Sequence, residues 1–146
     1  MKQFQILGLA LFLAMPFLTF AQISNNGIDQ RLNDKYSIEY LNDLKSQDPA
    51  ALDYLNYFVE NVYRIIDMPD KQIACLDLKR VDVTNNQPIT LAEMENFNLY
   101  KYNCTVLPDK RMFYKIKNTG KLLIIKSEKE LKDSFSNDQR LSGNNK

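Results

Sequence analysis

The sequence predicts an α+β fold in which two N-terminal helices pack on a small antiparallel β-meander, with short capped helices before and after the meander. Two observations carry this prediction. Over residues 48–69, apolar residues recur at spacings of three and four, as they do on the buried face of a helix. After residue 98, apolar and polar residues alternate in short runs separated by turn residues, as they do in half-buried strands.

Residues 1–21 have the features of a secretory signal peptide. Lys2 supplies a positive start, an apolar run extends from Ile6 to Phe20, and Thr19-Phe20-Ala21 is an acceptable cleavage site. The run is short for a membrane span and contains Pro16. We therefore expect residues 1–21 to be cleaved, which leaves no transmembrane segment; an uncleaved N-terminal anchor is the alternative. No cysteine lies near the junction, so we do not expect a lipoprotein.

The mature chain is expected to form a single α+β domain over residues 36–135. Before this domain, residues 22–35 are polar and predict a flexible arm. After it, the polar residues 136–146 predict a disordered tail. Within the domain, Ser37 is a suitable N-cap for a first helix over residues 37–46.

The central helix is the element that the sequence specifies best. Asp48 can cap its N-terminus, and Pro49 suits the first helical position because the missing N–H has no partner to lose there. Pro69 cannot continue a helix, so a helix of about 18 residues is predicted between Asp48 and Pro69. Its apolar stripe comprises Leu52, Leu55, Val59, Val62 and Ile66. Tyr54 and Tyr57 lie towards the edge of this stripe and are candidates for contact with a partner.

Beyond the central helix the pattern changes to a strand-like alternation. Residues 72–83 predict one strand or two short strands, and residues 84–88 predict a loop. Thr90 and Glu93 then form a capping box, which predicts a short helix that ends near Asn98.

Three strands are predicted to form the meander. They span residues 99–106, 111–117 and 121–126, with turns at Pro108-Asp109 and Asn118-Thr119-Gly120. The last strand is apolar on both sides, so we expect it to be central or covered on both faces. Ser127 and Glu130 form a second capping box, which predicts a short helix that continues to Phe135.

Several short sequence runs and the amino-acid composition bear on where the protein is located. The junction Phe20-Ala21-Gln22, the Tyr-Leu-Asn-Tyr run at 54–57 and a composition rich in asparagine, lysine and isoleucine resemble short uncharacterised exported proteins of Bacteroidota bacteria. The resemblance implies a location in the periplasm or at the outer membrane, and it implies no activity.

The residue types present exclude several classes of function. The chain has no histidine, which removes Ser-His-Asp and Cys-His catalysis and every histidine metal site. Its four glycines form no glycine-rich phosphate cradle. Lysine and arginine number 19 against 18 acidic residues, and this near-neutrality argues against nucleic-acid binding. We therefore expect no enzyme, no cofactor, no metal site and no nucleic-acid partner.

Cysteine supplies one candidate structural feature. Cys75 and Cys104 are the two cysteines of the chain. In an oxidising compartment they are candidates for a disulfide between the first strand region and the meander. The alternative is two reduced thiols that act as small apolar side chains.

The sequence predicts a non-catalytic exported domain, periplasmic or envelope-associated, that acts through protein–protein contacts, for example as an accessory subunit of an envelope assembly. Its interaction surface is expected to comprise Tyr54, Tyr57, Arg111, Phe113, Lys115 and Lys117. The alternative function is a small-ligand or glycan-binding module that uses the basic aromatic sheet face of Arg111, Phe113, Lys115 and Lys117. For that face itself, the competing interpretation is a solvated surface whose lysines protect edge strands.

Overall fold

The computed structural model describes residues 26–68, 74–80 and 89–143. The predicted signal peptide, the loop expected over 84–88 and the end of the expected tail lie outside these residues. Within them, the elements follow in the order η1 (Gln30–Asp34), α1 (Ile38–Gln47), α2 (Pro49–Asn61), β1 (Tyr63–Asp67), β2 (Leu76–Asp77), α3 (Leu91–Glu95), η2 (Leu99–Lys101), β3 (Met112–Ile116), β4 (Lys121–Ile125) and α4 (Glu128–Gly143). The predicted α+β class is confirmed.

The strands form a mixed sheet rather than a purely antiparallel meander. Its described strands have the order β1-β4-β3-β2, in which β4 pairs antiparallel with both β1 and β3, while β2 runs parallel to β3. The central position of β4 explains its continuous apolar sequence, because Leu122 and Leu123 point to opposite faces and both are fully buried. The predicted hairpin turn after β3 is present, with Asn118 and Gly120 at positive φ.

The segment 99–106, predicted as the first strand of the meander, does not form a strand in the structure. It contains the 3₁₀ helix η2, and its strand character is limited to one isolated bridge between Arg80 and Tyr102. The reason is local: the side chain of Asn98 accepts a hydrogen bond from the backbone N–H of Tyr100 and begins a helical turn instead of an extended strand.

The central helix is shorter than predicted. It begins at Pro49 with Asp48 as its N-cap, as predicted, but it ends at Asn61, and residues 63–67 form β1. Arg64, Ile65 and Ile66 pair with β4, which gives this stretch of β-branched and aromatic residues a full ladder of hydrogen bonds. A spacing of four residues between Val62 and Ile66 fits both the apolar stripe of a helix and one face of a strand, so the pattern alone could not distinguish them.

Both ends of the domain contain more regular structure than predicted. In the expected flexible arm, Ile28 is 2% exposed and Leu32 is fully buried, and η1 forms around Leu32. In the expected tail, α4 continues past Phe135 to Gly143. Each extension is held by tertiary contacts with α2, which a scan for local composition does not detect.

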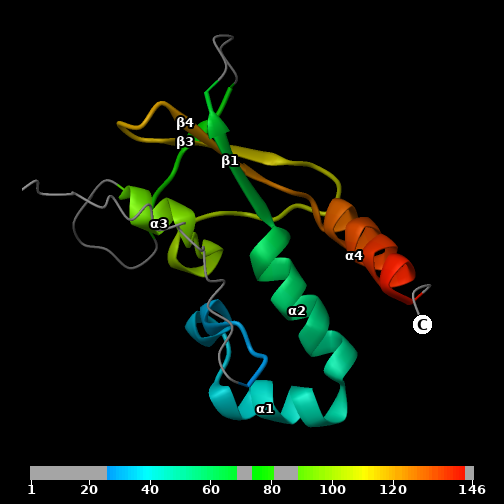
Figure 1. Cartoon of the computed structure of the whole chain (residues 1–146). Helices are drawn as coiled ribbons and strands as arrows, with labels where there is room; N and C mark the ends of the chain where they lie inside the picture. The colour runs from blue at the N-terminus through cyan, green and yellow to red at the C-terminus, as the bar shows by residue number, and fades with distance from the viewer. Residues whose placement is uncertain (1–25, 69–73, 81–88, 144–146) are drawn as a thin grey trace, which may run out of the picture.

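The described core has two parts that meet at α2. One cluster lies between the sheet, the α3–η2 segment and the start of α4, and includes Phe97, Tyr114 and Leu123. The other joins η1, α1 and α2 and includes Leu32 and Leu41. Phe58 and Tyr100 pack against both clusters. Figure 1 shows that α2 runs from α1 towards the sheet and that α4 lies alongside α2. The helix α1 lies at the far end of α2 and packs on α2, not on the sheet (Figure 1).

Candidate functional site

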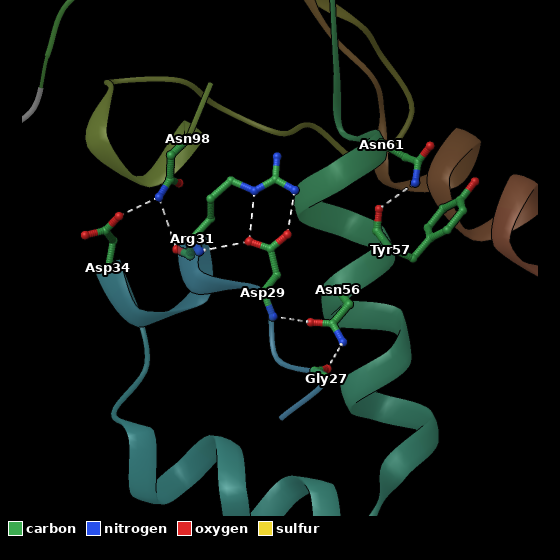
Figure 2. A network of polar contacts seen from close by, with 8 residues as sticks. All are labelled: Gly27, Asp29, Arg31, Asp34, Asn56, Tyr57, Asn61 and Asn98. Carbon is green, nitrogen blue, oxygen red and sulfur yellow. Dashed lines mark hydrogen bonds and ion pairs between the residues drawn. The ribbon is translucent and has the colours of Figure 1, made fainter. Parts of the chain in front are cut away.

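A network of polar side chains fixes the N-terminal segment against α2 (Figure 2). The backbone N–H of Asp29 donates to Oδ1 of Asn56 at 2.9 Å, and Nδ2 of Asn56 donates to the carbonyl oxygen of Gly27 at 2.8 Å. The carboxylate of Asp29, which is 7% exposed as a residue, accepts hydrogen bonds from Nε and Nη2 of Arg31 at 2.9 and 2.6 Å. Because this charge is paired on both oxygens, its burial is tolerated.

The same network reaches across to η2 through Asn98, which is 5% exposed. Its Nδ2 atom donates to the carbonyl oxygen of Arg31 at 3.1 Å and to Oδ2 of Asp34 at 2.5 Å. Lys35 follows directly after Asp34, and Tyr100 lies two residues after Asn98. The network therefore fixes the two chain segments that supply one wall of a pocket.

The pocket lies where η1, α2, η2 and the start of α4 meet. It has a volume of about 460 Å³, within the usual range of roughly 300–1,000 Å³ for small-ligand sites. Its lining residues are Lys35, Phe58, Leu99, Tyr100, Tyr102, Asn103, Cys104, Val106 and Glu128. Five of these nine residues are aromatic or aliphatic, and Lys35 and Glu128 are charged. The exposed surface of the pocket is more polar than apolar.

Burial favours the neutral forms of two groups in the pocket wall, the Tyr100 phenol and the Cys104 thiol. Burial raises the pKa of Tyr100 above its ordinary value of 10.0, with a smaller contribution from neighbouring Tyr36. Burial also raises the pKa of the Cys104 thiol from 9.0 to about 12. A thiol with so high a pKa is almost entirely protonated at neutral pH, which makes it a poor nucleophile.

A group of tyrosines borders the pocket. The rings of Tyr36 and Tyr40 stack with centroids 5.5 Å apart, and Tyr36 meets Tyr100 edge to face at 6.4 Å. The ammonium of Lys35 lies 5.5 Å from the Tyr36 ring centroid and 5.0 Å from that of Tyr100. We call Lys35, Tyr36, Tyr40 and Tyr100 the tyrosine surface. Tyr40 is 49% exposed, so this surface offers an aromatic face to solvent.

The predicted contact residues on the central helix are partly used inside the fold. Tyr54 and Tyr57 both pack against Phe135 of α4, with ring centroids 5.2 and 5.1 Å apart. Burial is the main cause that raises the pKa of each phenol. These two tyrosines therefore hold α4 against α2. Only the part of each ring that does not contact Phe135 is left for a partner.

The predicted basic aromatic face on β3 is present in part. Phe113 and Lys115 share one face of the strand, opposite buried Tyr114 and Ile116. Lys117 lies exposed in the turn that follows β3, and the guanidinium of Arg111 is engaged by the carboxylate of Glu130 in α4. The structure thus divides the six predicted contact residues between a helix–helix contact and the sheet.

The predicted disulfide is not formed in the structure, where Cys75 and Cys104 are free thiols. The backbone N–H of Asn103 donates to the carbonyl oxygen of Lys79, which places Cys104 near Leu78. Cys75 lies three residues before Leu78, about 10 Å away from it if this stretch is extended. A disulfide needs Cα atoms within about 7 Å of each other, so this pairing of the two segments does not favour a bridge.

Sequence reasoning missed the pocket and the tyrosine surface. Tyr36 and Tyr40 are four residues apart, which is a usable signal for a stacked pair at a helix start. No such signal joins Lys35, Tyr100 and Glu128, because tertiary folding alone brings them together.

The described residues contain neither a cluster of three metal-ligating side chains nor a helix that could span a membrane. Within residues 26–68, 74–80 and 89–143, no three side chains of cysteine, aspartate or glutamate gather as metal ligands would. None of the helices in these ranges combines the length and the apolar character needed to cross a membrane. Comparison with known proteins places the chain in no family, since no protein-family model, no curated protein and no solved structure matches it.

Proposed function

We propose that this protein is a non-catalytic exported domain that acts through contact with a protein partner in the cell envelope, as an accessory subunit would. The observation that carries the proposal is the tyrosine surface, with Tyr40 half exposed and stacked on Tyr36. Tyrosine is enriched in protein interfaces because it combines a large apolar ring with a polar tip.

The tyrosine surface is preorganised for binding. Tyr36 is held between the rings of Tyr40 and Tyr100, and Lys35 is positioned over two of these rings. The hydrogen bonds of Asn98 to Arg31 and Asp34 fix the backbone on both sides. Side chains that are already ordered lose less conformational entropy on association, which favours binding.

The remaining parts of the proposal have separate support. The absence of histidine and the raised pKa of Cys104 argue against the usual nucleophiles and bases. The signal-peptide pattern of residues 1–21 supports export.

Cross-linked pull-down of tagged protein from its native cell envelope, followed by mass spectrometry, tests the proposal. We expect one dominant partner in a near-stoichiometric amount, and Tyr40→Ala should reduce its recovery at least several-fold. The matched control is Ile38→Ala, because Ile38 lies on the same helix with 47% exposure but outside the tyrosine surface. Recovery of the protein alone, soluble and monomeric, would contradict the proposal, as would equal recovery with Tyr40→Ala.

The second candidate function, a small-ligand module, is favoured by one specific observation, the pocket beside the tyrosine surface. A concave site with aromatic walls is the usual form of a small-ligand site. The support for this function therefore comes from the pocket rather than from the sheet face of Phe113 and Lys115.

A further inference from the structure

The pocket has charges of opposite sign in its lining. Among the lining residues that the structure describes, Lys35 and Glu128 carry the charges, and the others are neutral. Lys35 follows η1, whereas Glu128 is the first residue of α4. A ligand that carries both an anionic and a cationic group could therefore meet a complementary charge at each.

Both charges are accessible to a ligand. Within the described chain, no carboxylate lies within ion-pair distance of Lys35, whose ammonium instead rests over the rings of Tyr36 and Tyr100. Glu128 contacts Lys132 at 3.6 Å, and these side chains are 48% and 64% exposed. An exposed pair at this distance is weak, so the Glu128 carboxylate remains able to bind a second cation.

Part of the remaining lining is apolar and can contact an apolar group. Phe58, Leu99 and Val106 supply aliphatic and aromatic area, and the Tyr102 ring is fixed by stacking on Phe97 with centroids 4.9 Å apart. Side chains locked in this way form a preorganised binding wall. The pocket volume of about 460 Å³ suits a compact ligand rather than a polymer chain.

We infer that the pocket binds a compact zwitterion with an aromatic or aliphatic side chain, namely a free amino acid or a short peptide. The ligand carboxylate would pair with Lys35, its ammonium with Glu128, and its side chain would pack against Phe58, Leu99 and Val106. The pocket shares Lys35 and Tyr100 with the tyrosine surface, whereas Tyr36 and Tyr40 belong to that surface and do not line the pocket.

Cys104 provides a reporter inside the pocket. In a Cys75→Ser background, the rate at which iodoacetamide alkylates Cys104 can be followed by intact mass, with and without the dipeptide Ala-Phe. We expect millimolar Ala-Phe to slow alkylation at least threefold. The matched probe is N-acetyl-Ala-Phe-amide, which keeps the apolar body without the two charges and should protect less. No protection by Ala-Phe, free phenylalanine or free leucine, or equal protection by the neutral probe, would overturn the inference.

Charge variants test the two ends of the ligand separately. Lys35→Gln and Glu128→Gln should each weaken Ala-Phe binding about three- to tenfold in calorimetric titration. Lys110→Gln and Glu95→Gln, at exposed positions outside the pocket, should leave it unchanged. Thermal unfolding verifies that each variant is folded. Unchanged affinity in both pocket variants would contradict the inference, and Tyr40→Ala should retain Ala-Phe binding even where it abolishes the partner contact.

Discussion

The side-chain amide of Asn98 donates to the carbonyl oxygen of Arg31 at 3.1 Å, across 67 positions of sequence. The same nitrogen also bonds Asp34, and its amide oxygen accepts from the backbone N–H of Tyr100. One buried amide thus joins the N-terminal segment to the wall of the pocket. Its environment is fully satisfied, as is that of every buried polar side chain in the described residues.

Asn98→Ala is expected to lower the free energy of unfolding by about 2 kcal/mol, because it leaves buried polar groups without partners. Urea unfolding measures this change. The control is Asn61→Ala, which removes a hydrogen bond of 3.0 Å to Tyr57 within one helix and should cost less than about 1 kcal/mol. A loss for Asn98→Ala no larger than that of the control would show that the network does not fix the segment.

Leu32→Ala tests whether the N-terminal segment belongs to the folded core. Leu32 is fully buried among Ile28, Leu41 and Leu52, so the truncation should cost about 2–4 kcal/mol in unfolding free energy. Ile38→Ala, at a side chain that is 47% exposed, should cost far less. A flexible arm, in contrast, would tolerate both substitutions equally.

Phe135→Ala tests what holds the second half of α4. Removing the ring that Tyr54 and Tyr57 contact should cost about 1–2 kcal/mol and free the turns beyond it. Amide hydrogen exchange should then show lost protection over residues 136–143, with protection retained in α2. Asp133→Ala, at an exposed position of the same helix, is the control. Unchanged protection after Phe135→Ala would mean that the helix does not depend on this contact.

Because of the ion pair between Arg111 and Glu130, part of the folding stability should be lost in acid. The hydrogen bond from Arg111 is the first cause that lowers the Glu130 pKa from 4.5 to about 2, with further help from the Ser127 cap. Because the folded pKa is the lower one, this stabilisation is complete above about pH 4.5 and is lost as the pH falls towards 2. Both side chains are partly exposed, so its size should stay below about 1 kcal/mol.

Thermal unfolding of native protein and Arg111→Gln at pH 6 and pH 3 measures this loss. The difference in stability between the two proteins should shrink at pH 3. Lys110→Gln removes a neighbouring positive charge without this ion pair and controls for net charge. A difference that stays constant between the two pH values would refute the assignment.

The raised pKa of Cys104 predicts slow alkylation. With a pKa of about 12, its reaction rate in folded protein should rise roughly tenfold per pH unit from pH 8 to 10. Intact-mass measurement of a Cys75→Ser variant follows this rate, and the same variant in urea gives the unfolded reference. Equal rates in folded and unfolded protein would show that the thiol is not buried.

Local sequence determined the helix starts. Ser37 and Asp48 cap α1 and α2, and Thr90–Glu93 and Ser127–Glu130 form the two predicted capping boxes. Each of these hydrogen bonds spans three positions, so the residues that decide it lie close together in the sequence. For the same reason, the turn at Asn118–Gly120 and the strands on either side of it were predictable.

Tertiary structure alone decided where α2 ends and whether the segments around Leu32 and Phe135 are ordered. Residues 63–67 become a strand because β4 is available to pair with them, and Leu32 and Phe135 are ordered because α2 offers them an apolar partner. The pocket, too, exists only after folding, since its wall is assembled from Lys35, Tyr100 and Glu128. Contacts between residues far apart in the chain leave no periodic trace in sequence, because their energy depends on packing that forms only when the whole domain folds.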